Sequence, residues 1–486
     1  MNLRRSPAEI RFRIAQEFWN FRTFLFPPRA PSDLNGFQRL FPPAENSLPF
    51  LDRCPSWKAN TLALARQIAG GEIPLLGSSV TFHPDRNPAS DWRRDSINGP
   101  ISSLDYFRRI PYLNVSLAGD HKVIWELNRH QHLVLLAQAA LLEPEEPLWL
   151  KTVERHLETW FEANPFHRGM NWASALEVAF RALSWIWILH LAGDRLSGGI
   201  RSRLLDSLYA HGLHIEHNLS IYFAPNTHLL GEAVCLHALG CLLPQLPQAG
   251  RWRQLGQRWV ERSMAEQVLP DAVYFEQSSF YHLYAIDFFL FHALLSPVSE
   301  SYRQRAKSMV AALAVLTDND GRFPLFGDDD GGRFFHPFGE RRLFPGATLT
   351  SASFFFDEPA WRGTPDQYAE AGLWWMGAQR PEEFPDTPYR STRHGAFADS
   401  GIFAFTGREL QCVFLARAFG KGSAGHSHAH ALSFTLRLSQ RDLLIDSGTY
   451  TYVGDAEIRN RFRSAAAHNT IVIDSLNQAT PVNAFR

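Results

Sequence analysis

The densest group of chemically capable side chains is the segment GHSHAHALSF, which places His426, His428 and His430 at every second position. On a β-strand these three side chains would share one face. Three imidazoles on one face are costly to leave without partners, so we expect a metal ion or a polyanion beside them. The alternative is a polar strand end whose histidines face solvent, because an isolated histidine is usually structural.

Two further metal-ligand types follow this segment in the sequence. Asp446 lies in LLIDSGTY and His468 lies in AAAHNTIVI, each beside an apolar run typical of a strand. Neighbouring strands can bring such residues together, and a set of imidazole and carboxylate donors suits Zn²⁺. The spacing therefore favours a zinc site and the solvent-exposed alternative about equally.

A second group of polar side chains lies in a helical region. Asn226 is placed to begin a helix, on which His228 and Glu232 then fall at i and i+4 on one face. A histidine oriented by a carboxylate is a plausible acid or base. About fifty residues further on, Tyr281 and Tyr284 lie on another periodic helix, although tyrosines at this spacing usually belong to a core.

Tryptophan-rich helical segments carry a third set of polar groups. Arg129 and Arg181 could bind a sugar carboxylate with two hydrogen bonds, and Asn171 and Trp172 lie between them in the sequence. Indole rings also stack on pyranose faces. Helix packing with internal salt bridges explains the same residues equally well.

The acidic loop GDDDGGR, residues 327–333, offers three consecutive carboxylates for Ca²⁺. It lacks the alternating ligand spacing of an EF-hand loop. We therefore interpret it as a loop that caps helices or contacts the second domain.

The elements that must position these groups are mainly helices from about residue 50 to 385. The apolar spacing in Lys122–Leu142 predicts one helix with a single buried face. Similar segments, separated by loops with Pro or Gly, are expected at Leu148–Phe161, Trp172–Leu191, Ile200–His217, Thr227–Leu239, Arg251–Gln267, Ser279–Leu295 and Ser301–Leu316. Consecutive helices with short loops indicate a bundle or a closed α/α ring.

The period of the apolar pattern changes near residue 390. The segments FADSGIFAF, LQCVFLARA, ALSFTLRL, RDLLIDSGTYTYV and NTIVID alternate or run in β-branched and aromatic residues, as antiparallel strands do. A β domain is therefore expected from about Ser391. Only about 95 residues follow, so we expect the β-sandwich to be incomplete in this chain.

Composition and charge exclude several classes of protein. A net charge of −1 disfavours nucleic acid as a partner, and the 45% apolar and 20% charged residues are typical of a globular chain. The four cysteines are too few and too scattered for a disulfide framework.

The longest apolar run, Ala182–Gly193, is too short for a membrane span. The N-terminus predicts an amphipathic helix without a cleavable signal, which favours a cytoplasmic location over a periplasmic one. The oligomeric state is not indicated.

Eight motifs, in the order in which they occur, resemble those of the heparinase II/III-like polysaccharide lyases, a group that includes alginate lyases. The resemblance spans residues 90 to 478 approximately and rests on DHKVIWELNRHQH, GMNWASALEVAFRALSW, NTHLLGEA, YFEQSSFYH, PLFGDDDGGR, GHSHAHALSF, IDSGTYTY and AAAHNTIVID. It implies a multidomain chain, α then β: an incomplete α/α toroid followed by an antiparallel β-sandwich. We expect a helical extension over 1–50, the toroid over 51–388 and a partial β-sandwich over 389–486.

The resemblance also implies a reaction, β-elimination at a uronic acid by a carbon-oxygen lyase. The proton alpha to the uronate carboxylate is weakly acidic, so Asn and His donors must neutralise that carboxylate. On the matched motifs, His228 is the neutraliser or base and Asn226 the candidate amide. Tyr281 is the catalytic phenol, with Tyr284 as the fallback, and His426 is a second acid/base or carboxylate partner.

Relatives that bind zinc have ligands matching His428, Asp446 and His468, in a structural site that fixes His426 through neighbouring contacts. No organic cofactor is expected. This sequence differs from the common HxHxD pattern at His430, and Thr227 stands directly before His228 where many relatives have Asn.

The sequence therefore predicts a lyase whose substrate is an acidic, uronate-containing polysaccharide or oligosaccharide, bound in part by Arg129, Asn171, Trp172, Arg181, Glu232 and Tyr284. Two alternatives stay open. An α/α-toroid glycoside hydrolase would use two carboxylates among Glu126, Glu177 and Glu232. A non-catalytic polysaccharide-binding or assembly protein would keep the aromatic and arginine side chains without turnover.

Overall fold

The computed structural model describes residues 5–31, 37–38, 41–84, 87–335, 337–380, 383–385, 392–420 and 426–480. The chain divides into two compact units, which are described separately. Unit 1 comprises Met1–Leu40 and Thr61–Val260, and unit 2 comprises Phe41–Asn60 and Glu261–Arg486. The domain boundary expected at residues 388 and 389 lies outside the described residues, so the expected domain limits stay a prediction.

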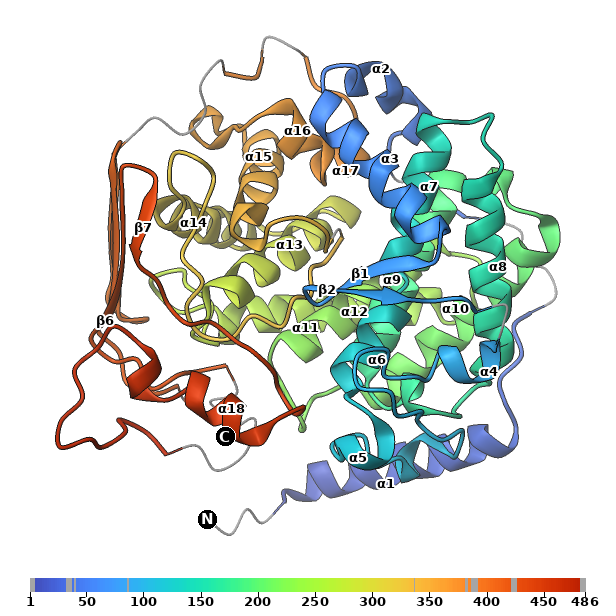
Figure 1. Cartoon of the computed structure of the whole chain (residues 1–486). Coiled ribbons are helices and arrows are strands. Elements are labelled where there is room, and N and C mark those ends of the chain that lie inside the picture. Colours follow the sequence, from blue (N-terminus) through green and yellow to red (C-terminus); the bar gives the residue numbers. More distant parts are fainter. Residues whose placement is uncertain are drawn as a thin grey trace. The chain divides into compact units, whose positions relative to one another are not determined.

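Unit 1 is helical apart from one hairpin (Figure 1). Its helices are α1 (Pro7–Leu25), α4 (Pro88–Asp91), α5 (Val115–Ala118), α6 (His121–Asn128), α7 (Gln131–Leu142), α8 (Leu148–Ala163), α9 (Ala175–Ala192), α10 (Gly198–Asn218) and α11 (Thr227–Leu242), with short 3₁₀ turns at Phe107–Arg109, Met170–Trp172 and Gly193–Arg195. The hairpin pairs β1 (Glu72–Leu75) with β2 (Ser78–Thr81). Helices α3 (Pro55–Ala69) and α12 (Ala249–Gln267) run across the boundaries between the units.

Helix α9 forms the centre of unit 1. Ser174 caps its first turn, and every residue from Ala175 to Ala192 is buried. Helices α7, α10 and α11 pack on it (Figure 1). The stretch Ala175–Arg195 is long and apolar enough to cross a membrane, but its apolar window of 18 residues is fully buried, as the core helix of a globular unit would be.

The helix predicted over Lys122–Leu142 is wrong in one respect, because it is two helices. Helix α6 ends at Asn128, and α7 begins at Gln131. His130 between them has a φ of 60°, which lies in the left-handed region and breaks the helical hydrogen bonding. The apolar spacing continues on both sides of the break, so periodicity alone does not reveal it.

Unit 2 contains the remaining helices and the larger sheet. The helices are α2 (Leu48–Leu51), α13 (Ser279–Leu295), α14 (Glu300–Leu316), α15 (Phe344–Phe356), α16 (Pro365–Ala369), α17 (Gly372–Met376) and α18 (Ala456–Phe462), with 3₁₀ turns at Ala44–Ser47, Arg341–Leu343, Pro359–Trp361 and Ala465–Ala467. Ser278 and Ser299 cap α13 and α14 through their side-chain oxygens. The bounds of both helices agree closely with the prediction.

The sheet of unit 2 is an antiparallel meander in the order β3-β4-β5-β6-β7. Its strands are β3 (Arg393–Phe397), β4 (Ile402–Thr406), β5 (Leu410–Leu415), β6 (Ser433–Leu438) and β7 (Arg441–Leu444). The order of helices and then antiparallel strands therefore agrees with the expected fold class. The described residues contain this single sheet of the β domain.

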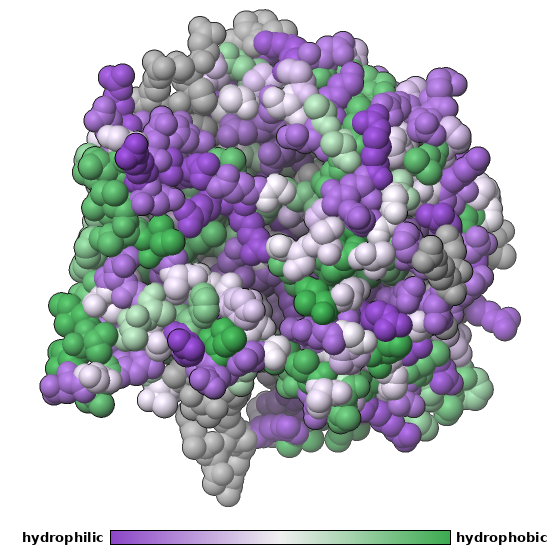
Figure 2. All heavy atoms as spheres, viewed as in Figure 1, coloured by the Kyte–Doolittle hydropathy of each residue, from purple (hydrophilic) through white to green (hydrophobic). Residues whose placement is uncertain are grey.

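One face of the sheet packs on helix α14, and the other faces solvent. Ile402 and Val413 lie on the inner face, in a core with Leu316 at the end of α14. On the outer face Phe403 and Phe434 are 40% and 36% exposed, and apolar side chains gather over β6 and β7 at the left of Figure 2. This alternation is the pattern from which the strands were predicted.

Two of the strand predictions are wrong within the described residues. His426, His428 and His430 lie in the irregular segment before β6 and not on a strand. The segment NTIVID, residues 469–474, is also irregular and makes one isolated bridge, from Ile473 to Leu476. Alternation and β-branched residues describe an extended chain equally well when no neighbouring strand pairs with it.

Candidate active site

The phenol of Tyr281 is positioned by the cap of helix α13. The Ser278 side chain accepts a hydrogen bond from the backbone N–H of Tyr281 at 3.2 Å, which fixes the first turn. Tyr281 is 6% exposed. The sequence SSFY therefore places this phenol at the start of a rigid helix.

Tyr281 contacts two other ring systems of unit 2. The imidazole ring of His426 stacks on the Tyr281 ring, with centroids 3.8 Å apart and an angle of 20° between the planes. The hydroxyl oxygen of Tyr281 lies 3.4 Å from that of Tyr452. Burial raises the pKa values of both phenols well above the usual value, and the charge of Asp330 acts in the same direction. Both hydroxyls are therefore protonated at neutral pH and can act as proton donors.

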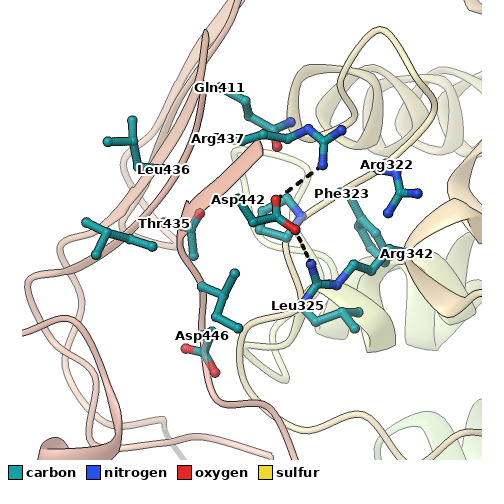
Figure 3. A pocket seen from close by; sticks show the side chains of 13 residues that line it. Arg322, Phe323, Leu325, Arg342, Gln411, Thr435, Leu436, Arg437, Asp442 and Asp446 are labelled. Atoms are coloured by element: carbon teal, nitrogen blue, oxygen red, sulfur yellow. Dashed lines mark hydrogen bonds and ion pairs between the residues drawn. The ribbon is translucent and has the colours of Figure 1, made fainter. Parts of the chain in front are cut away.

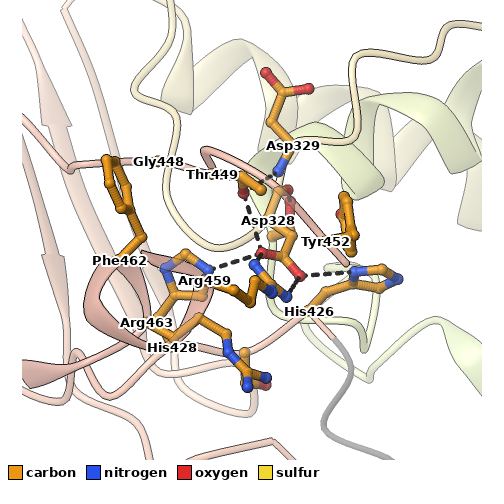
Figure 4. A network of polar contacts seen from close by, with 12 residues as sticks. Asp328, Asp329, His426, His428, Gly448, Thr449, Tyr452, Arg459, Phe462 and Arg463 are labelled. Atoms are coloured by element: carbon orange, nitrogen blue, oxygen red, sulfur yellow. Dashed lines mark hydrogen bonds and ion pairs between the residues drawn. The ribbon is translucent and has the colours of Figure 1, made fainter. Parts of the chain in front are cut away.

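His426 lies between two carboxylates. Its Nδ1 is 3.2 Å from Asp328 Oδ2 (Figure 4). Its Nε2 is 3.3 Å from Glu276 Oε1. Burial alone would lower the pKa of His426, but the charge of Glu276 and the hydrogen bond to Asp328 outweigh it and raise the pKa. This imidazole is consequently suited to carry a positive charge.

Asp328 is kept ionised by the cation of helix α18. Burial opposes its ionisation, but the Arg459 guanidinium holds the pKa of Asp328 well below the usual value, together with hydrogen bonds from two histidines. Arg459 donates to both carboxylate oxygens, with Nη2 2.6 Å from Oδ2. Both side chains are buried, so this is a desolvated ion pair.

The predicted zinc ligands lie together in unit 2. One ring nitrogen from each of His428, His430 and His468 lies within 4.8 Å of those of the other two. His428 Nδ1, His430 Nδ1 and His468 Nε2 are buried and have no hydrogen-bond partner among the described residues. Asp446 Oδ2 lies 3.0 Å from His468 Nδ1 and 3.7 Å from His430 Nδ1. Three unpartnered imidazole nitrogens beside a carboxylate fit the ligand preferences of zinc.

The residues predicted from the NTHLLGEA motif lie in unit 1. Asn226 caps helix α11, and its side-chain oxygen accepts from the backbone N–H of His228 at 3.0 Å. His228 is half-buried in the first turn. Glu232 is fully buried and accepts from the backbone and the hydroxyl of Ser220 at 2.7 and 2.6 Å, and burial raises its pKa to about 8. Its carboxylate is bound to Ser220, and the orienting role expected for it toward His228 stays a prediction.

The two arginines predicted to bind a sugar carboxylate are buried in unit 1. Arg129 donates to both oxygens of Glu177, at 2.7 and 2.8 Å. Arg181 lies on the Trp160 ring, with its guanidinium carbon 4.5 Å from the centroid, and it donates to His211 Nε2 at 2.9 Å. These contacts favour the second interpretation of the sequence, in which the arginines hold helices together.

Asn171 and Trp172 belong to the same interior. Asn171 is fully buried and donates to the side-chain oxygens of Asn128 and Asn164, each at 2.8 Å. Trp172 is 2% exposed and packs edgewise on Phe166. Tyr284 is also buried and lies in unit 2 with its ring 6.1 Å from that of Tyr281. The substrate-binding roles of these residues stay predictions.

Four side chains of the cluster around His426 were not predicted from the sequence to lie there, although one of them, Asp328, belongs to the acidic loop considered for Ca²⁺. They are Glu276, Asp328, Tyr452 and Arg459. Tyr452 lies in the motif GTYTY directly after the predicted ligand Asp446, and this proximity is the one local signal that could have indicated it. No sequence motif indicates Arg459, because its contact with Asp328 joins residues that are far apart in the sequence.

A pocket on unit 2, lined in part by the predicted zinc ligand Asp446, differs in character from the cluster around Tyr281. It is lined by Arg322, Arg342, Arg437 and Asp442 among others, and Asp442 pairs with two of these arginines (Figure 3). None of the residues that line it is a tyrosine or a histidine. It therefore lacks the groups for proton transfer that surround Tyr281.

Phenols, an imidazole and buried carboxylates therefore lie together in unit 2, in a chain whose helices are followed by an antiparallel sheet. The family model for the heparinase II/III N-terminus matches residues 84–332, and the model for the heparinase II/III-like C-terminal domain matches residues 390–486. The chain therefore belongs to the heparinase II/III family.

Two curated relatives are heparin-sulfate lyases. The one from Bacteroides stercoris is 23% identical over 394 residues, which cover 74% of this chain and 55% of the relative. The one from Pedobacter heparinus is 24% identical over 289 residues, which cover 56% of this chain and 40% of the relative. The chain spans about half the length of these relatives.

Solved structures show the same fold. A crystal structure of heparinase III has a TM-score of 0.57 at 16% identity and covers 96% of this chain and 70% of its own. A heparan sulfate lyase mutant from Pedobacter heparinus has a TM-score of 0.51 at 21% identity, with coverages of 86% and 60%. These likenesses confirm the expected class, an α/α toroid followed by an antiparallel β domain.

Proposed function

We propose that the protein is a carbon-oxygen lyase that cleaves a uronic-acid-containing polysaccharide by β-elimination. The observation that carries the proposal is the contact of Tyr281 with both His426 and Tyr452. Membership of the heparinase II/III family and the names of the two curated relatives support the same activity.

In this reaction a base removes the proton alpha to the uronate carboxylate, and the glycosidic carbon–oxygen bond at the beta carbon breaks. The leaving oxygen takes up a proton, and a double bond conjugated to the carboxylate remains. Tyr281 is the proton donor, because burial keeps its phenol protonated. His426, with its raised pKa, supplies positive charge for the carboxylate on which negative charge builds. The resemblance of the motif NTHLLGEA to that of the family makes His228 the neutraliser or base and Asn226 the candidate neutralising amide.

The glycoside hydrolase alternative is less well supported by the contacts of unit 1. Glu177 accepts both hydrogen bonds from Arg129, and Glu126 lies 2.9 Å from Lys122 and 3.0 Å from Arg129. Glu232 is bound to Ser220. A hydrolase needs one carboxylate free to attack or to activate water. These three carboxylates are instead engaged in internal contacts.

The direct experiment is incubation of the purified protein with a panel of anionic polysaccharides that includes heparan sulfate, chondroitin sulfate and alginate. An increase in ultraviolet absorbance from unsaturated chain ends is the expected result with at least one of them. New reducing ends without this absorbance would instead indicate hydrolysis. Binding without any turnover would indicate the non-catalytic alternative.

The proposal includes a structural zinc ion held by His428, His468 and Asp446, with His430 as a further nitrogen donor. The three unpartnered imidazole nitrogens support this assignment. Bound zinc would fix the loop that carries these residues, and it would take no part in the proton transfers. Elemental analysis of the purified protein should give about one zinc ion per chain.

A further inference from the structure

Asp328 contacts side chains from separate parts of unit 2, and the proposed function gives it no role. Its side chain is fully buried, and its carboxylate lies between the rings of His426 and His428 (Figure 4). His426 Nδ1 is 3.2 Å from one oxygen, and His428 Nε2 is 2.9 Å from the other. The hydroxyl of Thr449 donates to the second oxygen at 3.0 Å, and Arg459 donates to both. One carboxylate therefore joins the proposed catalytic histidine to a proposed metal ligand.

The backbone around Asp328 is tied to the same two groups. Its N–H donates to the backbone oxygen of His426 at 3.1 Å, and its own carbonyl oxygen accepts from the Ser278 hydroxyl at 2.5 Å. Ser278 is the cap that fixes Tyr281 on helix α13. The preceding Gly327 has a φ of 72°, and a Cβ there would lie 2.6 and 3.0 Å from two backbone oxygens. Only glycine fits this approach, so the carboxylate has a fixed position.

A carboxylate that accepts from an imidazole N–H decides which ring nitrogen keeps its lone pair. In His428 the proton is on Nε2, which leaves Nδ1 free to bind a metal beside His430 and His468. In His426 the Nδ1–H donates to Asp328, and the ring is held in its stack on Tyr281. Arg459 keeps the carboxylate aligned for both bonds.

We propose that Asp328 is a positioning residue that sets the ring orientation of His426 for catalysis and of His428 for metal binding at the same time. The inference rests on the proposed function for its catalytic half and on the proposed zinc site for the other half. It assigns a role to the acidic GDDDGGR loop, in which Asp328 is the one carboxylate bonded to both histidines. It predicts that zinc affinity and turnover depend on the same side chain.

The test compares Asp328→Asn with Asp329→Asn. The second variant is a matched control, because Asp329 is the next residue of the loop and pairs with Arg341 at 3.0 Å. Each protein is stripped of metal and titrated with zinc against a chromophoric chelator, and kcat is measured on the polysaccharide that the parent cleaves. Asparagine has one acceptor oxygen and cannot hold both imidazoles, so we expect zinc affinity and kcat each to fall by about 10- to 100-fold. Asp329→Asn should keep the parent values.

The outcomes separate this inference from the proposed function. If the parent cleaves no polysaccharide but Asp328→Asn alone loses zinc affinity, the lyase proposal fails and the positioning of His428 stands. A folded Asp328→Asn variant with the zinc affinity of the parent overturns the inference. If that variant does not fold, Thr449→Val replaces it, because it removes one hydrogen bond to the carboxylate and should weaken zinc binding about fivefold. Unchanged zinc affinity in Thr449→Val would then overturn the inference.

Discussion

The imidazole of His426 lies face to face on the phenol of Tyr281, with ring centroids 3.8 Å apart. The two residues come from different elements of unit 2, one from the start of helix α13 and one from the segment before β6. Stacking hides the ring faces, and the polar atoms are left at the ring edges. At those edges the Tyr281 hydroxyl lies near that of Tyr452, and the two ring nitrogens of His426 lie near Asp328 and Glu276. The stack thus brings the groups for proton transfer together at the ring edges.

Replacement of Tyr281 by Phe tests the proposed proton donor. The variant removes one hydroxyl and keeps the stack on His426, so its thermal stability should equal that of the parent. We expect kcat for the release of unsaturated ends to fall by about 10² to 10⁴, the usual contribution of a positioned proton transfer. Tyr284→Phe is the matched control, and its kcat should fall far less. A Tyr281→Phe variant with parental kcat would remove this mechanism.

Tyr452 is expected to support the same step. Its hydroxyl is 3.4 Å from that of Tyr281, and it is 7% exposed. Tyr452→Phe should lower kcat by about tenfold or more, since a donor in the catalytic hydrogen-bond network is lost. Tyr450→Phe provides the control from the same GTYTY motif, because Tyr450 is 66% exposed. Equal kinetics for the two variants would show that Tyr452 plays no part.

The local elements of this site could be predicted from the sequence, whereas its tertiary contacts could not. Helix α13 with its Ser278 cap, and strands β4 and β5, follow directly from apolar spacing and turn residues. His130 has a left-handed conformation, and residues 426–430 follow an irregular path. The spacing of residue types around both is the same as in a continuous helix or strand, so it does not reveal them. Arg459 reaches Asp328 across 131 residues, and no local pattern encodes such a pair. The order of the motifs indicated the family and the candidate site residues, whereas the apolar periodicity indicated only helices and strands.

Unit 1 should be destabilised by mild acid because its core contains neutral histidines. Burial holds the pKa values of His130, His156, His211 and His214 well below 6.5. In the unfolded chain these groups titrate near pH 6.5, so below this pH the unfolded state binds more protons than the folded state and stability falls. Each such histidine lowers the free energy of unfolding by about 2 kcal/mol between pH 6.5 and pH 5. Melting temperatures measured from pH 8 to pH 5 should therefore decline steeply below pH 6.5.

One buried carboxylate in unit 1 opposes this trend. Burial raises the pKa of Glu232 to about 8, so the folded state takes up its proton first and stability rises as the pH falls from 8 towards 4.5. One such group cannot balance four histidines. In the Glu232→Gln variant the melting temperature should fall more steeply than in the parent as the pH decreases from 7.5. A melting temperature that is constant from pH 8 to pH 5 would contradict the burial of neutral histidines.

Removal of zinc should destabilise unit 2. A strong chelator is expected to lower the melting temperature of the parent and to have no effect on His468→Ala, which lacks one proposed ligand. His394→Ala is the control, because His394 is exposed on β3, away from the cluster. This variant should bind zinc like the parent in elemental analysis. Zinc content that is equal in His468→Ala and the parent would contradict the assignment of the ligands.

The ion pair between Arg129 and Glu177 distinguishes the two interpretations of the arginines in unit 1. Both side chains are buried, and the guanidinium makes two hydrogen bonds to the carboxylate. If the pair is structural, Arg129→Ala should lower the free energy of unfolding by about 3 to 5 kcal/mol, because it leaves Glu177 charged and buried. The double variant Arg129→Met with Glu177→Leu should recover much of that stability, since neither charge is left unpaired. If Arg129 instead binds substrate, the double variant would fold well and raise KM at least tenfold. Urea denaturation and KM measured on the same three proteins decide between the two roles.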